Sequence, residues 1–204
     1  LLGETEARAW ALDDRARLVQ VLDQMSIALR ATGDLDGAIA AGQQALALAD
    51  EHGDSVLQMQ TALYLGQAYF AINDFGRTAA LLQRNVEAVD RGAGTLTLST
   101  DMQIRSQAWL AWTLGALGAF AEGRRHGEEA LRLATLEGRG ATPINAHGCL
   151  GHLYLTKGDL EYAIQVLDQG LVFCRASGSL NGLPWIVAGL GYAYALQGRL
   201  AEGR

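Results

Sequence analysis

Histidine and cysteine, the side chains that zinc prefers as ligands, come together once in this chain, at His147, Cys149 and His152. On a helix, His147 and His152 would point roughly 140° apart and could not share an ion. Cys149 and His152 are three residues apart and could share one, but a structural zinc site uses four ligands. We therefore expect no metal site, and instead a histidine that faces a groove beside a buried thiol.

The acidic residues do not indicate a catalytic site either. They form pairs at Asp13-Asp14, Asp34/Asp36 and Glu128-Glu129. Helix capping and solvation explain such pairs better than acid–base catalysis. No hydroxyl nucleophile can be placed beside a base, and the sequence contains neither a phosphate loop nor a dinucleotide-binding glycine motif. The sequence therefore predicts a protein that is not an enzyme and needs no cofactor.

The composition narrows the class of partner. The 204 residues carry a net charge of -6 and 50% of them are hydrophobic. Arg124-Arg125-His126 is a short basic run that we expect to be a solvated face, because a nucleic-acid surface needs a broad basic patch. No apolar run reaches the roughly 18 residues of a membrane span, and Cys149 and Cys174 are too few for a disulfide framework. We expect a cytoplasmic protein that binds neither nucleic acid nor membrane.

A short corner motif recurs along the chain. The central residues of its copies are spaced by 40, 45, 40 and 40 residues, at Gly33, Asn73, Gly118, Gly158 and Gly198. Each corner has a small residue seven positions before it, a large one four before it, and a small one five after it. Gly and Asn are the residues that most readily adopt the left-handed conformation at a helix end. A period near 40 with such corners predicts stacked helical hairpins.

These marks resemble the tetratricopeptide repeat (TPR), in which a Gly is followed one turn later by a Tyr, and an Ala comes early in the second helix. Gly151, Tyr154 and Ala163 match all three positions, whereas Ser26/Leu29 and Ala111/Leu114 depart from the Gly/Tyr pair. The period is also longer than the usual ~34 residues. The resemblance implies an all-α, right-handed superhelical solenoid of stacked antiparallel helix hairpins.

The corners set the expected boundaries. We treat residues 1–204 as a single TPR-like solenoid fragment in which 1–12 is the tail of a preceding repeat. Complete repeats are expected at 14–52, 54–91, 98–137 and 142–176, with a truncated fifth repeat at 184–204. Asp159 is expected to cap the second helix of the fourth hairpin, and Pro143 and Pro184 suit first helical turns.

Two longer phrases resemble a narrower group of proteins. They are Ala45-Leu-Ala-Leu-Ala-Asp-Glu-His-Gly-Asp54 and Leu190-Gly-Tyr-Ala-Tyr-Ala-Leu-Gln-Gly-Arg199. Both are similar to the C-terminal repeat arrays of bacterial proteins that join an adenylate/guanylate cyclase domain to an ATPase domain, and to the arrays of MalT-like, LuxR-type regulators. The resemblance implies a module of a larger bacterial signalling or regulatory protein, and it does not identify the head domain.

In a stacked array, the first helix of each hairpin lines an inner groove. The positions expected to face it are mostly aromatic with few cations: Tyr64, Gln67, Phe70, Arg105, Trp109, Trp112, Asn145, His152, Trp185 and Tyr192. Aromatic and Arg side chains dominate binding hot spots, so we expect a protein or peptide partner, or another domain of the same chain. Two alternatives stay open. The groove binds a small-molecule effector, or some of these rings pack between adjacent repeats.

We expect the two ends of the sequence to fall inside repeats. We expect apolar surface from Leu190, Leu196 and Leu200 to be exposed as a result. Such surface would produce weak self-association through the ends.

Overall fold

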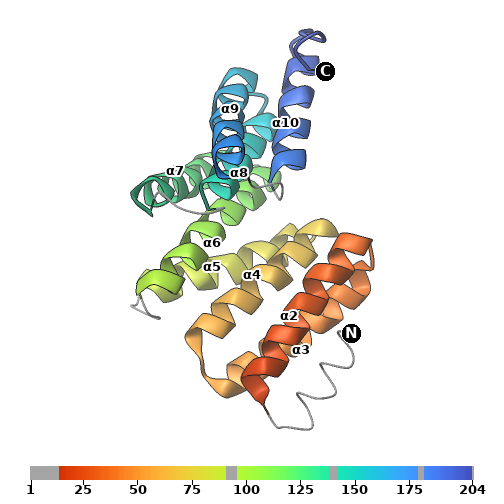
Figure 1. The fold of residues 1–204 in the computed structure, drawn as a ribbon, viewed down its shortest axis with the longest axis vertical. Helices are drawn as coiled ribbons and strands as arrows, with labels where there is room; N and C mark the ends of the chain where they lie inside the picture. Colours follow the sequence, from red (N-terminus) through yellow and green to blue (C-terminus); the bar gives the residue numbers. More distant parts are fainter. Residues whose placement is uncertain (1–13, 91–95, 138–141, 179–181, 204) are drawn as a thin grey trace. The chain divides into compact units, whose positions relative to one another are not determined.

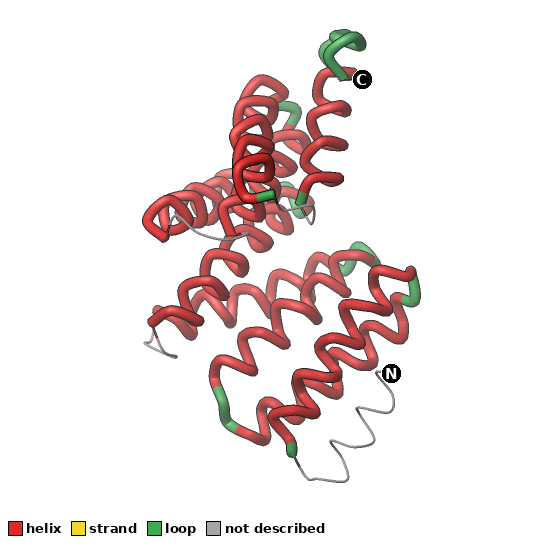
Figure 2. The backbone as a smooth tube through the Cα atoms, viewed as in Figure 1, coloured by secondary structure: helices red, strands yellow, loops and turns green. Residues whose placement is uncertain are grey.

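The computed structural model describes residues 14–90, 96–137, 142–178 and 182–203. Within these ranges the chain is helical and contains no β-strand (Figure 2). The helices are α2 (Arg15–Thr32), α3 (Leu35–His52), α4 (Ser55–Ala71), α5 (Phe75–Asp90), α6 (Leu96–Ala116), α7 (Phe120–Glu137), α8 (Thr142–Lys157), α9 (Leu160–Ser177) and α10 (Leu183–Leu196). They form antiparallel hairpins in which α2, α4, α6, α8 and α10 are the first helices (Figure 1). The predicted all-α class with helical hairpins is confirmed.

The corners have the backbone conformation that their residue types predict. Gly158 has φ +86°, which ends α8 in the left-handed region. Asn73 has φ +62° and is the only non-glycine residue with positive φ in the described ranges. The same conformation recurs at Gly33, Gly118 and Gly198. The repeat period is therefore a period of left-handed helix ends.

Aspartates cap several of the helices. Asp14 accepts a hydrogen bond from the backbone N–H of Arg17, and Asp34 accepts one from Gly37, each at 3.0 Å. Asp159 occupies the N-cap position of α9 as expected, but its side chain makes no cap bond and instead pairs with Lys157 Nζ at 2.5 Å. Lys157 ends α8 two residues earlier, so its ammonium competes successfully with the backbone N–H groups for the carboxylate.

The chain divides into two compact units, Leu1–Met102 and Gln103–Arg204, and the division falls inside α6. In unit 1, side chains of α2, α3 and α4 meet in a core of Leu18, Val19, Leu22, Ala45, Ala49 and Leu57. In unit 2, helices α8, α9 and α10 share a core of Ile144, Leu167, Cys174, Ile186 and Leu190. Small residues let the paired helices approach, as at Ala163, which is fully buried.

Two sequence expectations about exposure are corrected. Leu190 is only 5% exposed because it faces the core between α9 and α10, whereas Leu196 and Leu200 are exposed as expected. His126 is 4% exposed, unlike its neighbours Arg124 and Arg125, because it lies on the face of α7 that packs against α6. The expected tail at 1–12 lies outside the described residues, as do 92–95, 138–141 and 179–181 between the expected repeats, whereas α6 begins at Leu96, two residues before the expected start at 98. Both prolines, Pro143 and Pro184, fall in first helical turns.

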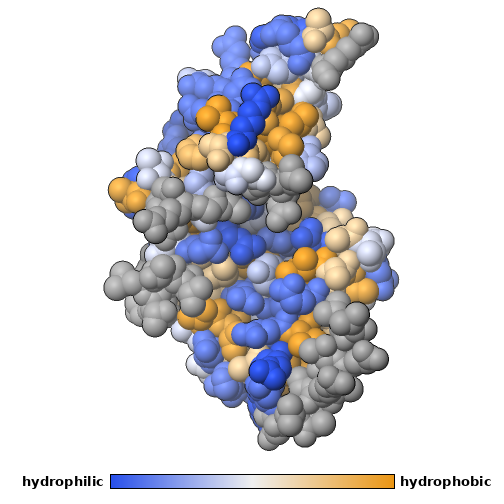
Figure 3. All heavy atoms as spheres, viewed as in Figure 1, coloured by the Kyte–Doolittle hydropathy of each residue, from blue (hydrophilic) through white to orange (hydrophobic). Residues whose placement is uncertain are grey.

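No helix among the described residues is long and apolar enough to cross a membrane. On the face that Figure 3 draws, hydrophilic and hydrophobic residues are interspersed and form no single apolar band.

Candidate functional site

The three residues of metal-ligand type face different surroundings. His147 is buried, with Nδ1 2.7 Å from the carbonyl oxygen of Pro143 and its ring 5.2 Å from that of Phe173. Cys149 is fully buried, and this burial raises the pKa of its thiol far above the usual value. His152 instead stacks among tryptophans. Across the described ranges, no group of three or more His, Cys, Asp or Glu side chains is placed to hold a metal ion.

The buried His126 is satisfied by hydrogen bonds at both ring nitrogens. Its Nδ1 lies 2.5 Å from Gln107 Oε1 of α6, and its Nε2 lies 3.3 Å from Arg125 Nη2. A neutral imidazole that donates to Gln107 and accepts from Arg125 fits both contacts. His126 therefore fastens α7 to α6.

An aromatic column connects the first helices of unit 2. The ring of His152 on α8 stacks on Trp112 of α6, with centroids 4.4 Å apart and 19° between the planes. It also lies 5.5 Å from Trp185 of α10, at an angle of only 6°. Trp109 extends the column, with centroids 5.4 Å from Trp112 and 6.5 Å from Trp185. We use the term aromatic column for Trp109, Trp112, His152 and Trp185.

The column is partly buried and rests on small residues. Trp109, Trp112 and Trp185 pack against a cluster of Ile104, Ala108, Ala130, Ala134, Ala146 and Cys149. Gly148 lies directly under Trp185, and a Cβ at this glycine would overlap the six-membered ring of the indole. These rings thus pack between the first helices of neighbouring repeats, which is one of the two alternatives left open by the sequence. Each of them is nevertheless only partly buried.

Burial in the column favours the neutral form of His152. The pKa of its imidazole is lowered because the charged ring would lose its water, and the contact of Nε2 with the carbonyl oxygen of Trp185 at 3.4 Å opposes this only in part. A neutral ring stacks on indole without placing a positive charge in the cluster. The column therefore presents an apolar surface with few polar atoms.

The other predicted residues of unit 2 lie along the same helix faces. Arg105 is four residues before Trp109, and its charge lowers the pKa of Cys149 against the effect of burial. Asn145 precedes His152 by seven residues, and Tyr192 follows Trp185 by seven, so each pair shares one side of its helix. Tyr192 is 59% exposed. We call the surface formed by these residues and the aromatic column the first-helix face of unit 2.

The predicted residues of unit 1 have more varied surroundings. Gln67 is buried and accepts a hydrogen bond from Arg30 Nη2 at 3.2 Å. Phe70 packs edge-on against Phe75 of α5, with centroids 5.1 Å apart. Tyr64 is half-buried on α4. In unit 1 the predicted residues thus join first helices through a polar contact, between Arg30 of α2 and Gln67 of α4, and not through stacked rings.

Unit 1 contains a fully buried carboxyl group, that of Asp23, whose burial the sequence does not predict. Asp23 of α2 is 0% exposed, and its Oδ2 accepts hydrogen bonds from Gln60 Nε2 at 3.0 Å and Thr61 Oγ1 at 3.2 Å, both on α4. Its Oδ1 has no hydrogen-bond partner among the described residues. Burial raises the pKa of the carboxyl to about 6, and the two hydrogen bonds limit the rise.

Known structures share this arrangement of helices, although no model of a protein family and no curated protein matches the sequence. BtubC (BKLC) from P. vanneervenii superposes with a TM-score of 0.69 over 99% of this chain and 82% of that chain, at 18% identity. A putative kinesin light chain from Podosopora anserina with nearly identical TPR-like repeats gives 0.64 over 93% and 90%, also at 18% identity. MamA gives 0.50 over 91% and 85%, at 19% identity.

The fold is TPR-like. At such low identities the likeness establishes the fold alone, so the TPR-like array must be assigned its function from its own surfaces. Those surfaces are the first-helix face of unit 2, the polar contact between α2 and α4 of unit 1, and a pocket among α3, α4 and α5 of unit 1.

Proposed function

We propose that this TPR-like array is a non-catalytic interaction module that binds a peptide or a helix of a protein partner on the first-helix face of unit 2. The observation that carries the proposal is the aromatic column, in which α6, α8 and α10 each contribute a ring to one partly exposed stack. Trp, Tyr and Arg are the residues that most often supply interface energy.

The column is suited to apolar side chains of a partner. A ligand would meet the exposed parts of these rings together with Tyr192, which lies about two turns after Trp185 on α10 and is 59% exposed. Aromatic edges carry partial positive charge and prefer the faces of other rings or carbonyl oxygens. Arg105 adds a cation that can bind a carboxylate or a backbone carbonyl. A segment with one aromatic or aliphatic anchor and a nearby acid fits this surface.

Hydrogen exchange tests where a partner binds. Peptides selected on the protein from a random-sequence display library should slow exchange in α6, α8 and α10 around the column. Protection confined to α7 and α9 would place the site on the second helices and contradict the proposal.

The wider setting is also proposed, on the strength of the resemblance to bacterial cyclase–ATPase and MalT-like arrays. In that setting the module belongs to a larger cytoplasmic regulator, and its partner is a separate protein or another domain of the same chain. The full-length open reading frame tests this directly, because a cyclase or ATPase domain upstream would support it and an unrelated context would contradict it.

A second candidate function is the sensing of a small effector. It is favoured by a specific feature, the pocket of unit 1 that is described next.

A further inference from the structure

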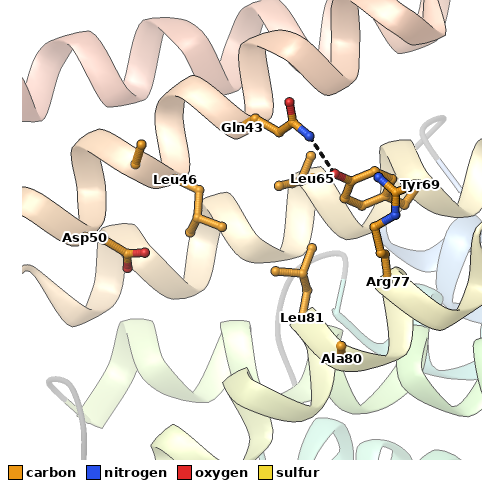
Figure 4. A pocket seen from close by; sticks show the side chains of 9 residues that line it. Gln43, Leu46, Asp50, Leu65, Tyr69, Arg77, Ala80 and Leu81 are labelled. Atoms are coloured by element: carbon orange, nitrogen blue, oxygen red, sulfur yellow. Dashed lines mark hydrogen bonds between the residues drawn. The ribbon is translucent and has the colours of Figure 1, made fainter.

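Unit 1 contains a pocket on a different set of residues from the first-helix face. Helices α3, α4 and α5 enclose a cavity of about 450 Å³. Figure 4 shows it from close by. Its lining is mostly apolar, with Leu46, Ala47, Leu65, Ala80 and Leu81, and its polar members are Gln43, Asp50, Tyr69 and Arg77. This size and this composition are typical of sites for small molecules.

Three polar groups converge at one end of the pocket. Gln43 Nε2 of α3 donates a hydrogen bond of 2.8 Å to the hydroxyl of Tyr69 on α4. The guanidinium of Arg77 on α5 lies over the ring of the same tyrosine, 4.7 Å from its centroid, and its Nε pairs with Asp74 at 2.7 Å. Each of the three helices thus contributes one member of this polar end, as Figure 4 shows.

The hydroxyl of Tyr69 can serve a ligand as well as Gln43. A tyrosine hydroxyl carries one proton and accepts through its lone pairs. A lone pair of Tyr69 receives the bond from Gln43, which leaves the hydroxyl proton to be donated to a ligand. The side chain is only 5% exposed and lines the pocket, so its position is fixed by the surrounding helices. A ligand oxygen placed there can accept the hydroxyl proton.

The charges at the two ends of the pocket differ in sign. Arg77 lies beside Tyr69, whereas Asp50 lies at the opposite end, where it pairs with Arg84 at 2.8 Å (Figure 4). Within the lining itself, an anionic ligand group would meet a cation at the Tyr69 end and a carboxylate at the Asp50 end, since neither Asp74 nor Arg84 lines the pocket. The apolar residues Leu46 and Leu81 lie between the two ends and would contact the rest of the ligand.

We propose that this pocket binds a small molecule that combines an apolar body with one carboxylate. The carboxylate accepts hydrogen bonds from the Tyr69 hydroxyl and the Gln43 amide and is attracted by Arg77. The apolar body lies on Leu46, Leu65 and Leu81. The site is separate from the peptide-binding face proposed for unit 2, so each can fail without the other.

Unit 2 provides an internal comparison. Tyr154 occupies the repeat position of Tyr69, four residues before its corner. The residue four positions after the corner is Arg77 in unit 1 but Tyr162 in unit 2, where it stacks on Tyr154 with centroids 5.6 Å apart. The corresponding pocket of unit 2 is lined by Arg124 and Lys157 and also by Glu128 and Asp159, the acids that pair with them, whereas Asp74, which pairs with Arg77, does not line the pocket of unit 1. A carboxylate should therefore prefer unit 1.

The test uses octanoate, with octanol and octylamine as matched ligands that lack the carboxylate. Titration of the whole chain, followed by NMR chemical shifts, should show saturable binding of octanoate at α3, α4 and α5, about ten-fold tighter than either comparison ligand. Arg77→Gln and Tyr69→Phe should each weaken binding about ten-fold, and Ala80→Phe, which fills the pocket, should abolish it. Tyr162→Phe in unit 2 is the control and should change nothing.

Several results would overturn the proposal. They are the absence of saturable binding, equal affinity for octylamine or octanol, unchanged affinity in Ala80→Phe, and shifts confined to unit 2. Circular dichroism and thermal unfolding of each variant establish that it is folded before its affinity is interpreted. A peptide bound to the first-helix face should not compete with octanoate, which separates this test from that of the proposed function.

Discussion

Gly151 of α8 packs so closely on Leu167 of α9 that a Cβ on this glycine would lie 2.5 Å from Leu167 Cγ. Leu167 is fully buried and has little room to move. Gly66 occupies the same repeat position in α4, but there a Cβ would lie 3.6 Å from the nearest atom of Leu82, which is an ordinary contact. Two equivalent glycines thus differ in the space beside them.

This difference predicts opposite outcomes for one substitution. Gly151→Ala should destabilise the protein by about 1–3 kcal/mol, because the paired helices must separate or Leu167 must leave its rotamer. Gly66→Ala should be neutral or stabilising by up to about 1 kcal/mol, since alanine favours helix. Chemical denaturation measures both. Equal effects of the two substitutions would mean that α8 and α9 are not packed as described.

Asp23 predicts a pH dependence of unit 1. Its pKa of about 6 in the folded state lies above the ordinary value of about 3.9 in the unfolded state, so the folded protein holds the proton more tightly. Between pH 4 and 6 the unfolded carboxyl loses its proton first, and the free energy of unfolding falls by on the order of 2 kcal/mol as the pH rises.

The variant Asp23→Asn removes this titration and preserves the shape of the side chain. The stability that the variant gains over the parent should be about 2 kcal/mol larger at pH 7.5 than at pH 4.5. Denaturation at the two pH values gives the comparison. A difference between variant and parent that does not change with pH would show that Asp23 ionises normally.

Two histidines of unit 2, His147 and His152, predict the opposite dependence of stability on pH. Burial lowers the pKa of both His147 and His152 below the ordinary value near 6.5. Their contribution to stability is present above pH 6.5 and is lost as the pH falls below it, because the unfolded chain then takes up protons that the folded chain does not. NMR titration of the ring protons should give midpoints below that of a histidine in a short peptide. A midpoint above 6.5 would contradict the stacked, desolvated position of His152.

Exposed apolar residues near the C-terminal end of α10 predict weak self-association. Leu196 and Leu200 are 52% and 61% exposed. The double variant Leu196→Glu/Leu200→Glu should lower the mean mass measured by light scattering at high concentration. Leu117, 51% exposed at the corner after α6, provides the control substitution Leu117→Glu, which should have no effect. A parent protein that stays strictly monomeric would contradict this prediction.

The sequence predicts the hairpins well because each corner depends on local chemistry. A left-handed Gly158 or Asn73 and a capping Asp34 are determined within a few residues of the corner itself. Such features need no knowledge of which helix lies opposite. The helix ends on either side of a corner follow from the same local chemistry.

Features that depend on contacts between repeats are predicted less well. The stacking of His152 on Trp112 joins residues 40 positions apart, and the space for Trp185 is provided by the absence of a side chain at Gly148. The arginine neighbours of His126 predict a surface position, but its partner Gln107 lies on another helix. Neither composition nor spacing gives the orientation of a ring or the partner of a buried polar group.

The pocket of unit 1 escapes prediction from the sequence for a related reason. Tyr69 matches the large position of the repeat, which indicates only a side chain that fills the core. Its hydroxyl end, and the Gln43 and Arg77 that meet it, belong to three different helices. The one available signal is Arg77 itself, a cation four residues after the Asn73 corner, where the Gly158 corner is followed by Tyr162.

The most direct test of the central claim is the affinity of a library-selected peptide for the parent protein and four variants. The proposed site predicts that Trp112→Ala, Arg105→Ala and Tyr192→Ala each weaken binding by about 1 kcal/mol or more, roughly five-fold, whereas Arg124→Glu on α7 changes it less than about two-fold. Tyr192→Ala is the most informative of the three, because this exposed ring lies outside the column and its loss should leave the melting temperature unchanged. If Arg124→Glu abolishes binding while Tyr192→Ala and Arg105→Ala have no effect, the partner binds the second helices and the account is wrong.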